Sequence, residues 1–509
     1  MEQNSNKKVV IVGAGINGLV AANYLARAGF DVTALERKAR AGGACCSVTR
    51  VIDGVPYEYP QGASVLGMMQ DFVFEETGLS KKVKIHEPSH PSIFYSKDGV
   101  ACLMWSDPDQ FEAEMREKFG ETGQAKQFLL DMGLVVSFLQ QGYRDAVVPT
   151  VKSAETTLGK ELTALWITGS ARSLLDHYLT AEATKIAFGI SVVESGPVSF
   201  DSPYSAFSIP LMSSGSIFGG AWGYVQGGIW QIPLALDAIN AELGVKRIFN
   251  ARVMKLNRER KEITYDQNGE EATLTADYII FATDPLTAAR IAGEKEIEER
   301  ITKQKILGAG GKLVMLFRKP VKWKGDTGMP EFDHALRDLP QVSTLDEFEE
   351  RAQAAANGAD FAAGNIEVYS EGLADLAMGG GRPYDIVSVY LGALGARKSG
   401  IELPQVKKQI ADLVLQQAEN PEDLIDTILE TPRDLMNWFF FPGGNIDHME
   451  LAEGQTFADR TYSADPANNF YQFGSDPGIF YCAAGTYPCG SVAGTSGYMC
   501  AKQLIRKIQ

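Results

Sequence analysis

The feature that most constrains the fold is a glycine-rich turn that lies between a short apolar segment and a helix near the start of the chain. Residues 8–12 form an apolar, β-branched run that is typical of a buried parallel strand. Residues 13–18 follow at once and match the pattern G-x-G-x-x-G. Apolar residues at helical spacing come next, and a second strand ends on Glu36. This order predicts a βαβ unit that binds a dinucleotide.

Each residue of this unit has a separate physical task. Gly13 permits the tight turn, Gly15 lets the backbone approach the pyrophosphate, and Gly18 lets the helix pack closely against the strand. The N-terminus of the helix offers free N–H groups and a favourable dipole to the phosphates. Glu36 can accept hydrogen bonds from the ribose hydroxyls, and Arg37 directly after it is a further candidate for binding the nucleotide.

Composition argues against several other classes of protein. The chain carries 48 basic and 64 acidic residues, a net charge of −16, so it is not expected to bind nucleic acid. Six cysteines in 509 residues do not suggest a disulfide framework, and the five histidines lack zinc-ligand spacing, so no metal is expected. With neither an apolar signal region before residue 8 nor a membrane-spanning run, a reduced cytoplasmic protein is expected. Peripheral membrane contact and a homodimer are left open.

The segment that follows Glu36 points to FAD through a resemblance. Residues 40–47 match R-x-G-G-x-x-x-S. This resembles the segment found after the acidic residue in flavin amine oxidases and phytoene desaturases. The resemblance implies that the backbone at Gly42 and Gly43 passes over the pyrophosphate and ribityl chain of FAD, with the charge of Arg40 near the phosphates. FAD is therefore the predicted cofactor.

Two motifs in the middle of the chain extend this resemblance. Residues 222–228 resemble the W-x-Y-x-x-G-G of the same superfamily, and a helix is expected after them. Residues 247–253 resemble the strand whose valine pairs with the adenine edge through its backbone amide and carbonyl. That valine would be Val253.

The C-terminal motifs are the most specific part of the resemblance. Residues 441–448 resemble the P-G-G-N-x-x-H of phytoene-desaturase-like proteins. Residues 478–488 then form a strand and a glycine turn, which implies that Gly485 and Gly494 lie in a crossover facing the flavin. Tyr487 replaces the histidine that the family usually has in this segment, a departure that argues against a carotenoid substrate.

The resemblance implies an α/β protein with a Rossmann-like FAD-binding domain and a discontinuous, mixed-sheet α+β substrate domain. The FAD-binding domain is expected to comprise residues 1–75, 220–300 and 440–509. The substrate domain is expected to comprise residues 76–219 and 301–439.

Two side chains are the catalytic candidates. Lys312 interrupts an otherwise apolar strand, and the resemblance to amine oxidases implies that it holds a water at flavin N5. The alternative places Lys312 at the solvated end of that strand. Tyr487 would lie beside the flavin and, with Trp222 and Tyr224, would form an aromatic slot for an amine or a flat apolar substrate. The alternative for Tyr487 is a buried tyrosine that packs on the edge of the flavin.

The sequence therefore predicts an FAD-dependent oxidoreductase that removes hydride from a C–C or C–N bond of an apolar small molecule. A phytoene-desaturase-like dehydrogenase is the leading interpretation, with oxygen, a quinone or another electron acceptor. An amine oxidase is the first alternative, favoured by Lys312 and Tyr487. A saturase or isomerase of double bonds and a non-catalytic flavin-binding scaffold are the others.

We predict that the purified protein is yellow and contains FAD, not FMN. The glycine turn and Glu36 address the adenosine half of the cofactor, which FMN lacks. Denaturing release of the flavin followed by chromatography identifies it. Recovery of FMN alone, or of no flavin after reconstitution, contradicts this prediction.

Overall fold

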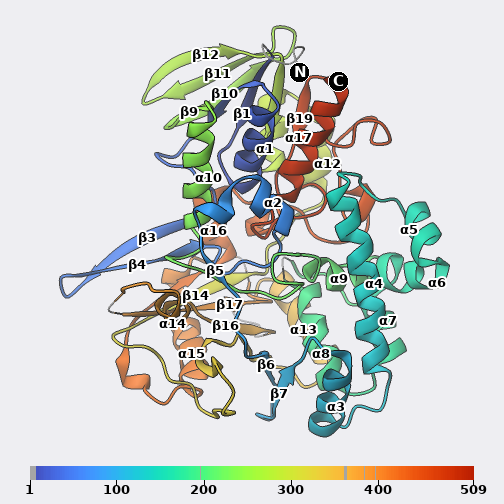
Figure 1. Ribbon diagram of the computed structural model, residues 1–509, viewed down its shortest axis with the longest axis vertical. Coiled ribbons are helices and arrows are strands. Elements are labelled where there is room, and N and C mark those ends of the chain that lie inside the picture. The colour runs from blue at the N-terminus through green and yellow to red at the C-terminus, as the bar shows by residue number, and fades with distance from the viewer. Residues whose placement is uncertain (1–6, 195, 360–363, 383, 396, 509) are drawn as a thin grey trace.

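The computed structural model describes residues 7–194, 196–359, 364–382, 384–395 and 397–508. A parallel sheet with its helices occupies one end of the molecule, a mixed sheet occupies the other, and a group of helices lies along one side (Figure 1). Residues 1–6, where the sequence predicted no signal segment, lie outside the described residues.

The parallel sheet carries the glycine-rich turn. Its strand order is β19 (Ile479–Tyr481), β13 (Tyr278–Phe281), β1 (Lys8–Val12), β2 (Asp31–Leu35) and β9 (Lys246–Ile248). Val9 and Ile11 point to a core formed with helices, whereas Val10 and Val12 point to a second core on the other face. Because successive residues of a strand face opposite sides, a strand covered on both faces is apolar throughout. This explains the continuous apolar run at residues 9–12, whereas Lys8 at the start of β1 is exposed.

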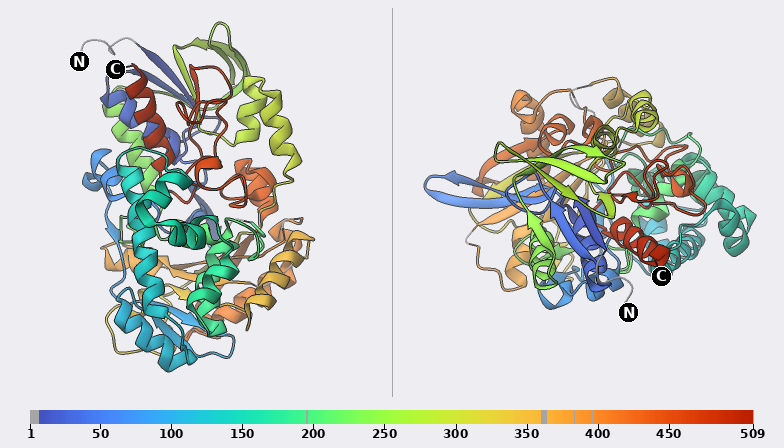
Figure 2. Two further views of the ribbon diagram at one scale, coloured as in Figure 1. Left: turned by 90° about the vertical axis from the view of Figure 1, so that its right-hand side faces the viewer. Right: turned by 90° about the horizontal axis from the view of Figure 1, so that it is seen from above.

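Helix α1 (Ile16–Arg27) follows the turn and packs between α10 (Gln231–Glu242) and α17 (Thr495–Ile508). The first and last helices of the chain, α1 and α17, therefore lie side by side (Figure 2). A Cβ added at Gly497 would lie 2.1 Å from the carbonyl oxygen of Asn17, so only glycine permits this approach of α17 to α1. The first and last parts of the chain thus form one structural unit.

The opposite face of the parallel sheet is covered by an antiparallel sheet of β10 (Ala251–Asn257), β11 (Glu262–Gln267) and β12 (Glu270–Thr275). The sequence predicted a strand at residues 247–253. The structure divides it, because the chain leaves the parallel sheet after β9 and enters the antiparallel sheet at β10. Asn250, between them, has φ 52, a left-handed conformation that asparagine tolerates better than most residues.

The second large sheet is mixed, as the sequence predicted. Its strand order is β18 (Leu424–Glu430), β14 (Gly311–Phe317), β17 (Asp385–Leu391), β16 (Ile366–Ser370), β15 (Arg337–Asp338), β6 (Ser92–Tyr95) and β7 (Ala101–Met104). Strands β15 and β6 pair in parallel and the other neighbours are antiparallel. These strands come from the two segments predicted for the substrate domain. The domain boundaries themselves stay a prediction.

The two faces of the mixed sheet have different covers. Helix α15 (Pro404–Leu415) packs on one face. On the other, Tyr57 and Tyr59 of the hairpin β3–β4 (Cys45–Ile52 and Val55–Gly62) pack against Val314 and Leu316 of β14. The hairpin belongs to the segment predicted for the FAD-binding domain, and it joins the two domains by this contact.

Helices of the first insertion form the side of the molecule shown at the right of Figure 1. Their bounds, with α2 before them, are α2 Asp71–Glu76, α3 Pro108–Phe119, α4 Ala125–Arg144, α5 Val151–Leu158, α6 Lys160–Thr163, α7 Ala171–Tyr178, α8 Glu182–Gly189 and α9 Ser208–Met212. The remaining helices are α11 Pro285–Ala292, α12 Lys295–Lys303, α13 Leu345–Ala356, α14 Glu371–Ala377 and α16 Pro432–Phe439.

Local sequence sets the ends of α3. The side chain of Asp107 accepts hydrogen bonds from the amides of Asp109 and Gln110, and Pro108 occupies the first turn, where its missing N–H costs nothing. Gly120 ends the helix with φ 66. The helix predicted near residues 109–119 is confirmed.

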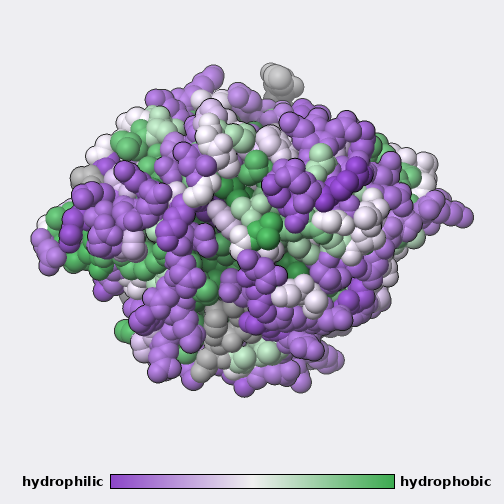
Figure 3. Space-filling model, turned by 90° about the horizontal axis from the view of Figure 1, so that it is seen from below, coloured by the Kyte–Doolittle hydropathy of each residue, from purple (hydrophilic) through white to green (hydrophobic). Residues whose placement is uncertain are grey.

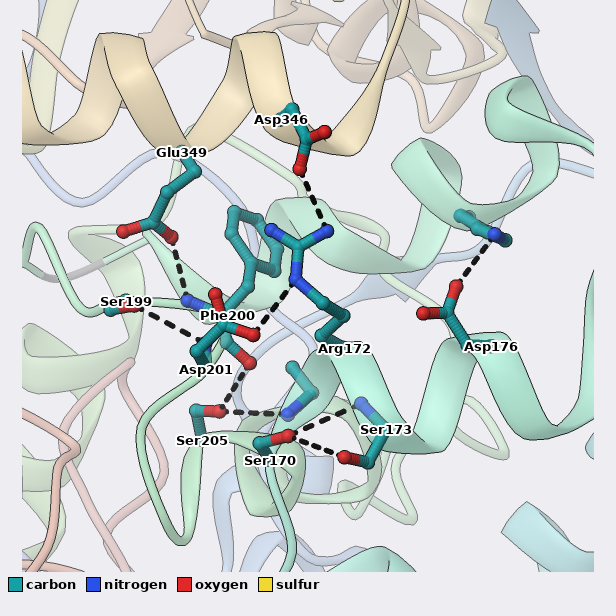
Figure 4. Close-up of polar contacts among 12 residues, drawn as sticks. Ser170, Arg172, Ser173, Asp176, Ser199, Phe200, Asp201, Ser205, Asp346 and Glu349 are labelled. Carbon is teal, nitrogen blue, oxygen red and sulfur yellow. Dashed lines mark hydrogen bonds and ion pairs between the residues drawn. The ribbon is translucent and has the colours of Figure 1, made fainter.

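An ion-pair cluster fastens the helical region to the mixed-sheet domain. The Nε of Arg172 lies 2.8 Å from Oδ1 of Asp201, and its Nη1 lies 2.9 Å from Oδ1 of Asp346 in α13 (Figure 4). The amide of Phe200 donates to Glu349, also in α13, at 2.7 Å. Arg172 therefore connects segments from both predicted insertions.

The surface seen from below is largely hydrophilic, with apolar side chains gathered in a hollow near its centre (Figure 3). Within the described residues, no helix is both long enough and apolar enough to cross a membrane. All six cysteines are buried, and in this described part of the chain each is a free thiol.

Two glycine substitutions should change stability in opposite directions. A Cβ at Gly18 would lie 2.2 Å from the carbonyl oxygen of Gly13, so Gly18→Ala should destabilise by about 1–3 kcal/mol or more. Gly133 is exposed in α4 with no atom within 4 Å of an added Cβ, so Gly133→Ala should stabilise by about 0.5–1 kcal/mol. Chemical unfolding curves of the two variants check this. Shifts of the same sign would contradict it.

Candidate active site

A cavity of about 980 Å³ connects the glycine-rich turn to the mixed sheet. This volume is at the upper end of the range for ligand sites. Residues of both expected domains line it: Gly13, Gly15, Asn17, Glu36, Arg37, Gly42, Gly43, Trp222, Val253, Lys312, Tyr369, Tyr390, Glu430 and His448.

At the nucleotide end of the cavity, glycine residues expose their backbone. Gly15 and Gly43 face each other, because a Cβ added at Gly43 would lie 3.2 Å from the Cα of Gly15. A Cβ at Gly15 would meet no atom closer than 3.9 Å and would occupy the cavity. Gly15 is also the N-cap of α1 and provides no side-chain cap, which leaves the first amides of the helix for a ligand. These features fit the pyrophosphate of a dinucleotide.

Glu36 lies beside this channel and is 7% exposed. Its Oε2 accepts from the amide of Ala14 at 2.9 Å, and its Oε1 accepts from the amide of Lys38 at 2.9 Å. An ionised carboxylate has about four acceptor positions, so capacity remains for the ribose hydroxyls. Glu36 thus fastens the glycine turn to the end of β2 while facing the cavity.

Arg37 holds a loop over the nucleotide end. Its guanidinium donates to the carbonyl of Trp438 at 2.7 Å and lies 3.8 Å from the centre of the Phe440 ring. Lys38 lies 4.4 Å from the centre of the Phe439 ring. Both rings line the cavity. The aromatic residues that end α16 are therefore held in the cavity wall by cation–π contacts.

Four predicted cofactor-binding residues lie behind the cavity wall. Gly18 provides the close packing of α1 described above, and an added Cβ at Gly494 would lie 2.9 Å from Val20 of the same helix. A Cβ at Gly485 would lie 2.8 Å from the Tyr481 hydroxyl. Arg40 donates to the carbonyl of Ser47. The positions of these four residues support a role in shaping the site and not direct contact with the cofactor.

A row of polar residues crosses the mixed sheet at the other end of the cavity. Lys312 of β14 is paired with Glu430 of β18 on one side and with Tyr390 of β17 on the other. Tyr390 is in turn paired with Glu367 of β16. Side chains at paired positions of neighbouring strands share a face. Lys312, Tyr390 and Glu430 accordingly all line the cavity.

Lys312 is buried and not at a solvated strand end, so that alternative is wrong. Its side chain is 6% exposed, and its Nζ donates to the carbonyl of Pro60 at 2.5 Å. The Nζ also lies 3.8 Å from Oε2 of Glu430, whose side chain is 1% exposed, and 3.5 Å from the Ser64 hydroxyl. Pairing with a carboxylate makes burial of the ammonium tolerable.

Several acidic groups around this row have raised pKa values. Burial raises the pKa of Glu430, and it raises the pKa of Glu371 to about 7. Burial also raises the pKa of Glu194 and of Glu367 above the ordinary glutamate range. Perturbed pKa values gather at functional sites, so this end of the cavity is the candidate reaction site.

The aromatic lining differs from the predicted one. Trp222 lines the cavity, but Tyr224 does not, since its hydroxyl donates to the carbonyl of His334 at 3.0 Å and accepts from the amide of Ser370 at 3.1 Å. Tyr369 and Tyr390 take the place expected for Tyr224. Sequence analysis missed these two tyrosines because no local motif surrounds them.

Tyr487 is fully buried and is not among the residues that line the cavity. Its ring packs near those of Tyr143, Phe457 and Phe470. The backbone on both sides of it does reach the cavity, at Ala484 and at Gly490. Its position therefore supports packing and does not support contact with the flavin or the substrate.

Two buried polar atoms of the cavity-lining residues fit the presence of a ligand. The Oδ1 of Asn17 and the Nδ1 of His448 have no hydrogen-bond partner among the described residues. Burial lowers the pKa of His448 to about 3, so its imidazole is neutral. A buried polar atom without a partner is costly, and a bound cofactor would remove that cost.

Comparison with known proteins agrees with this geometry. Residues 16–358 match the family described as flavin containing amine oxidoreductase. The chain is 25% identical to the rat pyridine nucleotide-disulfide oxidoreductase domain-containing protein 2, over 98% of this chain and 93% of that protein. It is 28% identical to hydroxyneurosporene desaturase of Cereibacter sphaeroides, over 56% of this chain and 57% of that one.

The fold is also shared with solved structures. Cyclohexylamine oxidase from Brevibacterium oxydans superposes with a TM-score of 0.59 at 16% identity, covering 99% of this chain and 98% of that chain. The Rossmann-like domain and mixed-sheet domain expected from the sequence are therefore confirmed as the fold.

The raised pKa of Glu371 predicts a pH-dependent stability. Its pKa moves from 4.5 to about 7 on folding, so between these values the folded state holds a proton that the unfolded state has released. The free energy of unfolding contributed by this group therefore falls as pH rises through this window. Glu371→Gln should therefore raise the free energy of unfolding at pH 8 more than it does at pH 5, by on the order of 2 kcal/mol.

Urea unfolding of parent and variant at both pH values measures the difference. Glu350→Gln, an exposed change in α13, is the matched control and should give no pH-dependent difference. An equal effect of Glu371→Gln at pH 5 and pH 8 would show that the carboxyl is not buried as described.

Proposed function

The chain belongs to the flavin-containing amine oxidoreductase family, and from that premise we propose that it removes hydride from a C–C or C–N bond of a small apolar molecule. One observation carries the proposal. A cavity joins the dinucleotide-binding turn to the row of Lys312, Tyr390 and Glu430, so a cofactor and a substrate can meet inside it.

FAD supplies the hydride acceptor when it is bound. Gly15 and Gly43 would leave room for its pyrophosphate, and Glu36 would accept hydrogen bonds from its ribose. Val253 lies in the cavity wall, where the sequence placed the adenine contact. Oxygen or a quinone is the proposed final electron acceptor.

The first candidate reaction is oxidation of a C–C bond. Apolar side chains of Leu435, Met436 and Phe441 line the cavity beside the aromatic residues that end α16, which favours an apolar substrate. The cofactor and substrate must share about 980 Å³, which favours a small molecule over a long polyene. Similarity to a desaturase over about half of the chain is consistent with this chemistry.

The second candidate is oxidation of an amine, and a separate observation favours it. Tyr369, Tyr390 and Trp222 line the cavity and offer aromatic faces, to which an ammonium group is attracted. Glu194 also lines the cavity, and its carboxyl would be a candidate to accept a hydrogen bond from the amine.

Lys312 has donor capacity for a water molecule in the cavity. An ammonium group has three donors. One donates to Pro60, whereas the contacts to Ser64 and Glu430 are at or beyond normal hydrogen-bond length. We propose that a water held here by Lys312 assists the oxidative half-reaction.

Substrate class can be determined by anaerobic bleaching of the flavin. Reduction by apolar alkanes or alkenes and not by amines supports the first candidate, and the reverse result supports the second. Reduction by neither class in a broad library would contradict the proposed function and favour a flavin-binding scaffold.

We predict that replacing Lys312 slows reoxidation by oxygen much more than it slows reduction. Lys312→Met alone would leave Glu430 buried without its partner, at a cost of about 3–5 kcal/mol. The double variant Lys312→Met/Glu430→Gln avoids that cost, and Glu430→Gln alone is its matched control. Stopped-flow traces of both half-reactions measure the rates. Equal reoxidation rates in the double variant and the control would remove Lys312 from this role.

A further inference from the structure

Two histidines and a glutamate that are far apart in the sequence meet beside the mixed-sheet domain. His86 ends β5 (Ile85–His86), His334 ends the 3₁₀ turn Phe332–His334, and Glu331 precedes that turn. The Nε2 of His86 lies 2.8 Å from Oε1 of Glu331, and the Nδ1 of His334 lies 3.7 Å from the same oxygen. One ligand atom from each residue lies within 4.8 Å of the others.

Both ring nitrogens are buried. Among the described residues neither has a partner with hydrogen-bond geometry, and each is instead in ion-pair contact with Glu331. The other oxygen of Glu331 accepts from the amide of Ser89 at 2.6 Å, which fixes the direction of the carboxylate. A cation at the centre of the three groups would use both imidazole lone pairs and the carboxylate at once. The hydrogen bond from Ser89 is the kind of outer contact that orients a metal ligand.

We propose that His86, Glu331 and His334 bind a divalent transition-metal ion, with Zn²⁺ as the best match, although the spacing of the histidines in the sequence predicted no metal. Two histidines and one glutamate form an established ligand set for Zn²⁺, at distances of about 2.0–2.2 Å. Tetrahedral ligands at that distance are about 3.4 Å apart. The distances of 2.8 and 3.7 Å to the Glu331 oxygen fall on either side of this value, and one ring nitrogen of each histidine lies within 4.8 Å of the other. The side chains would therefore rearrange around a bound ion.

The surroundings favour a cation. Glu331 and His334 line a pocket of about 500 Å³, together with Asp333 and Glu419. Asp326 and Lys322 line the same pocket, so its charged groups are mainly acidic. Acidic groups raise the local concentration of cations.

The ion would connect two insertions of the chain next to the candidate active site. His86 pairs with Tyr224 between β5 and β8 (Tyr224–Val225), and the carbonyl of His334 accepts from the Tyr224 hydroxyl. Trp222, two residues before Tyr224, lines the cavity. The metal is therefore a cross-link that holds the segment carrying Trp222, and it does not touch the reacting atoms. This inference is independent of the proposed function.

The test uses the full-length flavoprotein after treatment with a chelator. Isothermal titration with ZnCl₂ should show one ion bound per chain, and ZnCl₂ should raise the Tm. MgCl₂ should have no such effect, because Mg²⁺ prefers oxygen ligands. Removing a residue that only hydrogen-bonds to a metal ligand weakens metal binding about 10–100-fold. His86→Gln and His334→Gln remove a ligand itself, so each should weaken Zn²⁺ binding at least that much.

His177→Gln is the matched control, because His177 is exposed elsewhere on the helical side, and it should bind Zn²⁺ as the parent does. Glu331→Gln keeps the side-chain shape and serves if a histidine variant does not fold. If the parent and Glu331→Gln bind Zn²⁺ with the same affinity, or the parent does not bind it, the proposal is overturned.

Discussion

The structure depends on the close approach of backbone to backbone around α1, the helix that follows the first strand of the parallel sheet. Gly18 brings the start of the helix against the carbonyl of Gly13, and Gly497 brings α17 against the same helix. A side chain at either position would separate the elements. Because these contacts fix the N-terminus of α1 at the end of β1, the bare backbone at Gly15 faces the cavity and can accept a phosphate.

A second constraint operates on the mixed sheet, where a lysine is buried in the wall of the site. Lys312 is tolerable there because the register of β14 and β18 places Glu430 beside it. Breaking such a pair costs more than forming it contributes, so the two residues depend on each other. The hairpin β3–β4 completes the arrangement by presenting the carbonyl of Pro60 to Lys312. The nucleotide-binding segment thereby also shapes the reaction site.

Family membership agrees with a cavity that has a cofactor end and a substrate end. The flavin supplies the redox chemistry, so the chain needs only to hold the flavin and to form a substrate-binding cavity beside it. This cavity combines apolar side chains with Tyr369, Tyr390 and several buried acids. The chain is similar in sequence to a desaturase over about half of its length, and it shares its fold with a cyclohexylamine oxidase.

The sequence by itself determined the dinucleotide unit, the flavin cofactor and the class of fold, because their signals lie within short stretches of chain. Gly13, Gly15 and Glu36 could be predicted as a cofactor site from local order alone, and all three line one cavity. Only the tertiary structure decided which side chains meet across strands. Strand register paired Lys312 with Glu430, and packing turned Tyr487 into the core. Such contacts join residues far apart in the chain, and their geometry follows from how whole sheets and helices pack and not from any local pattern.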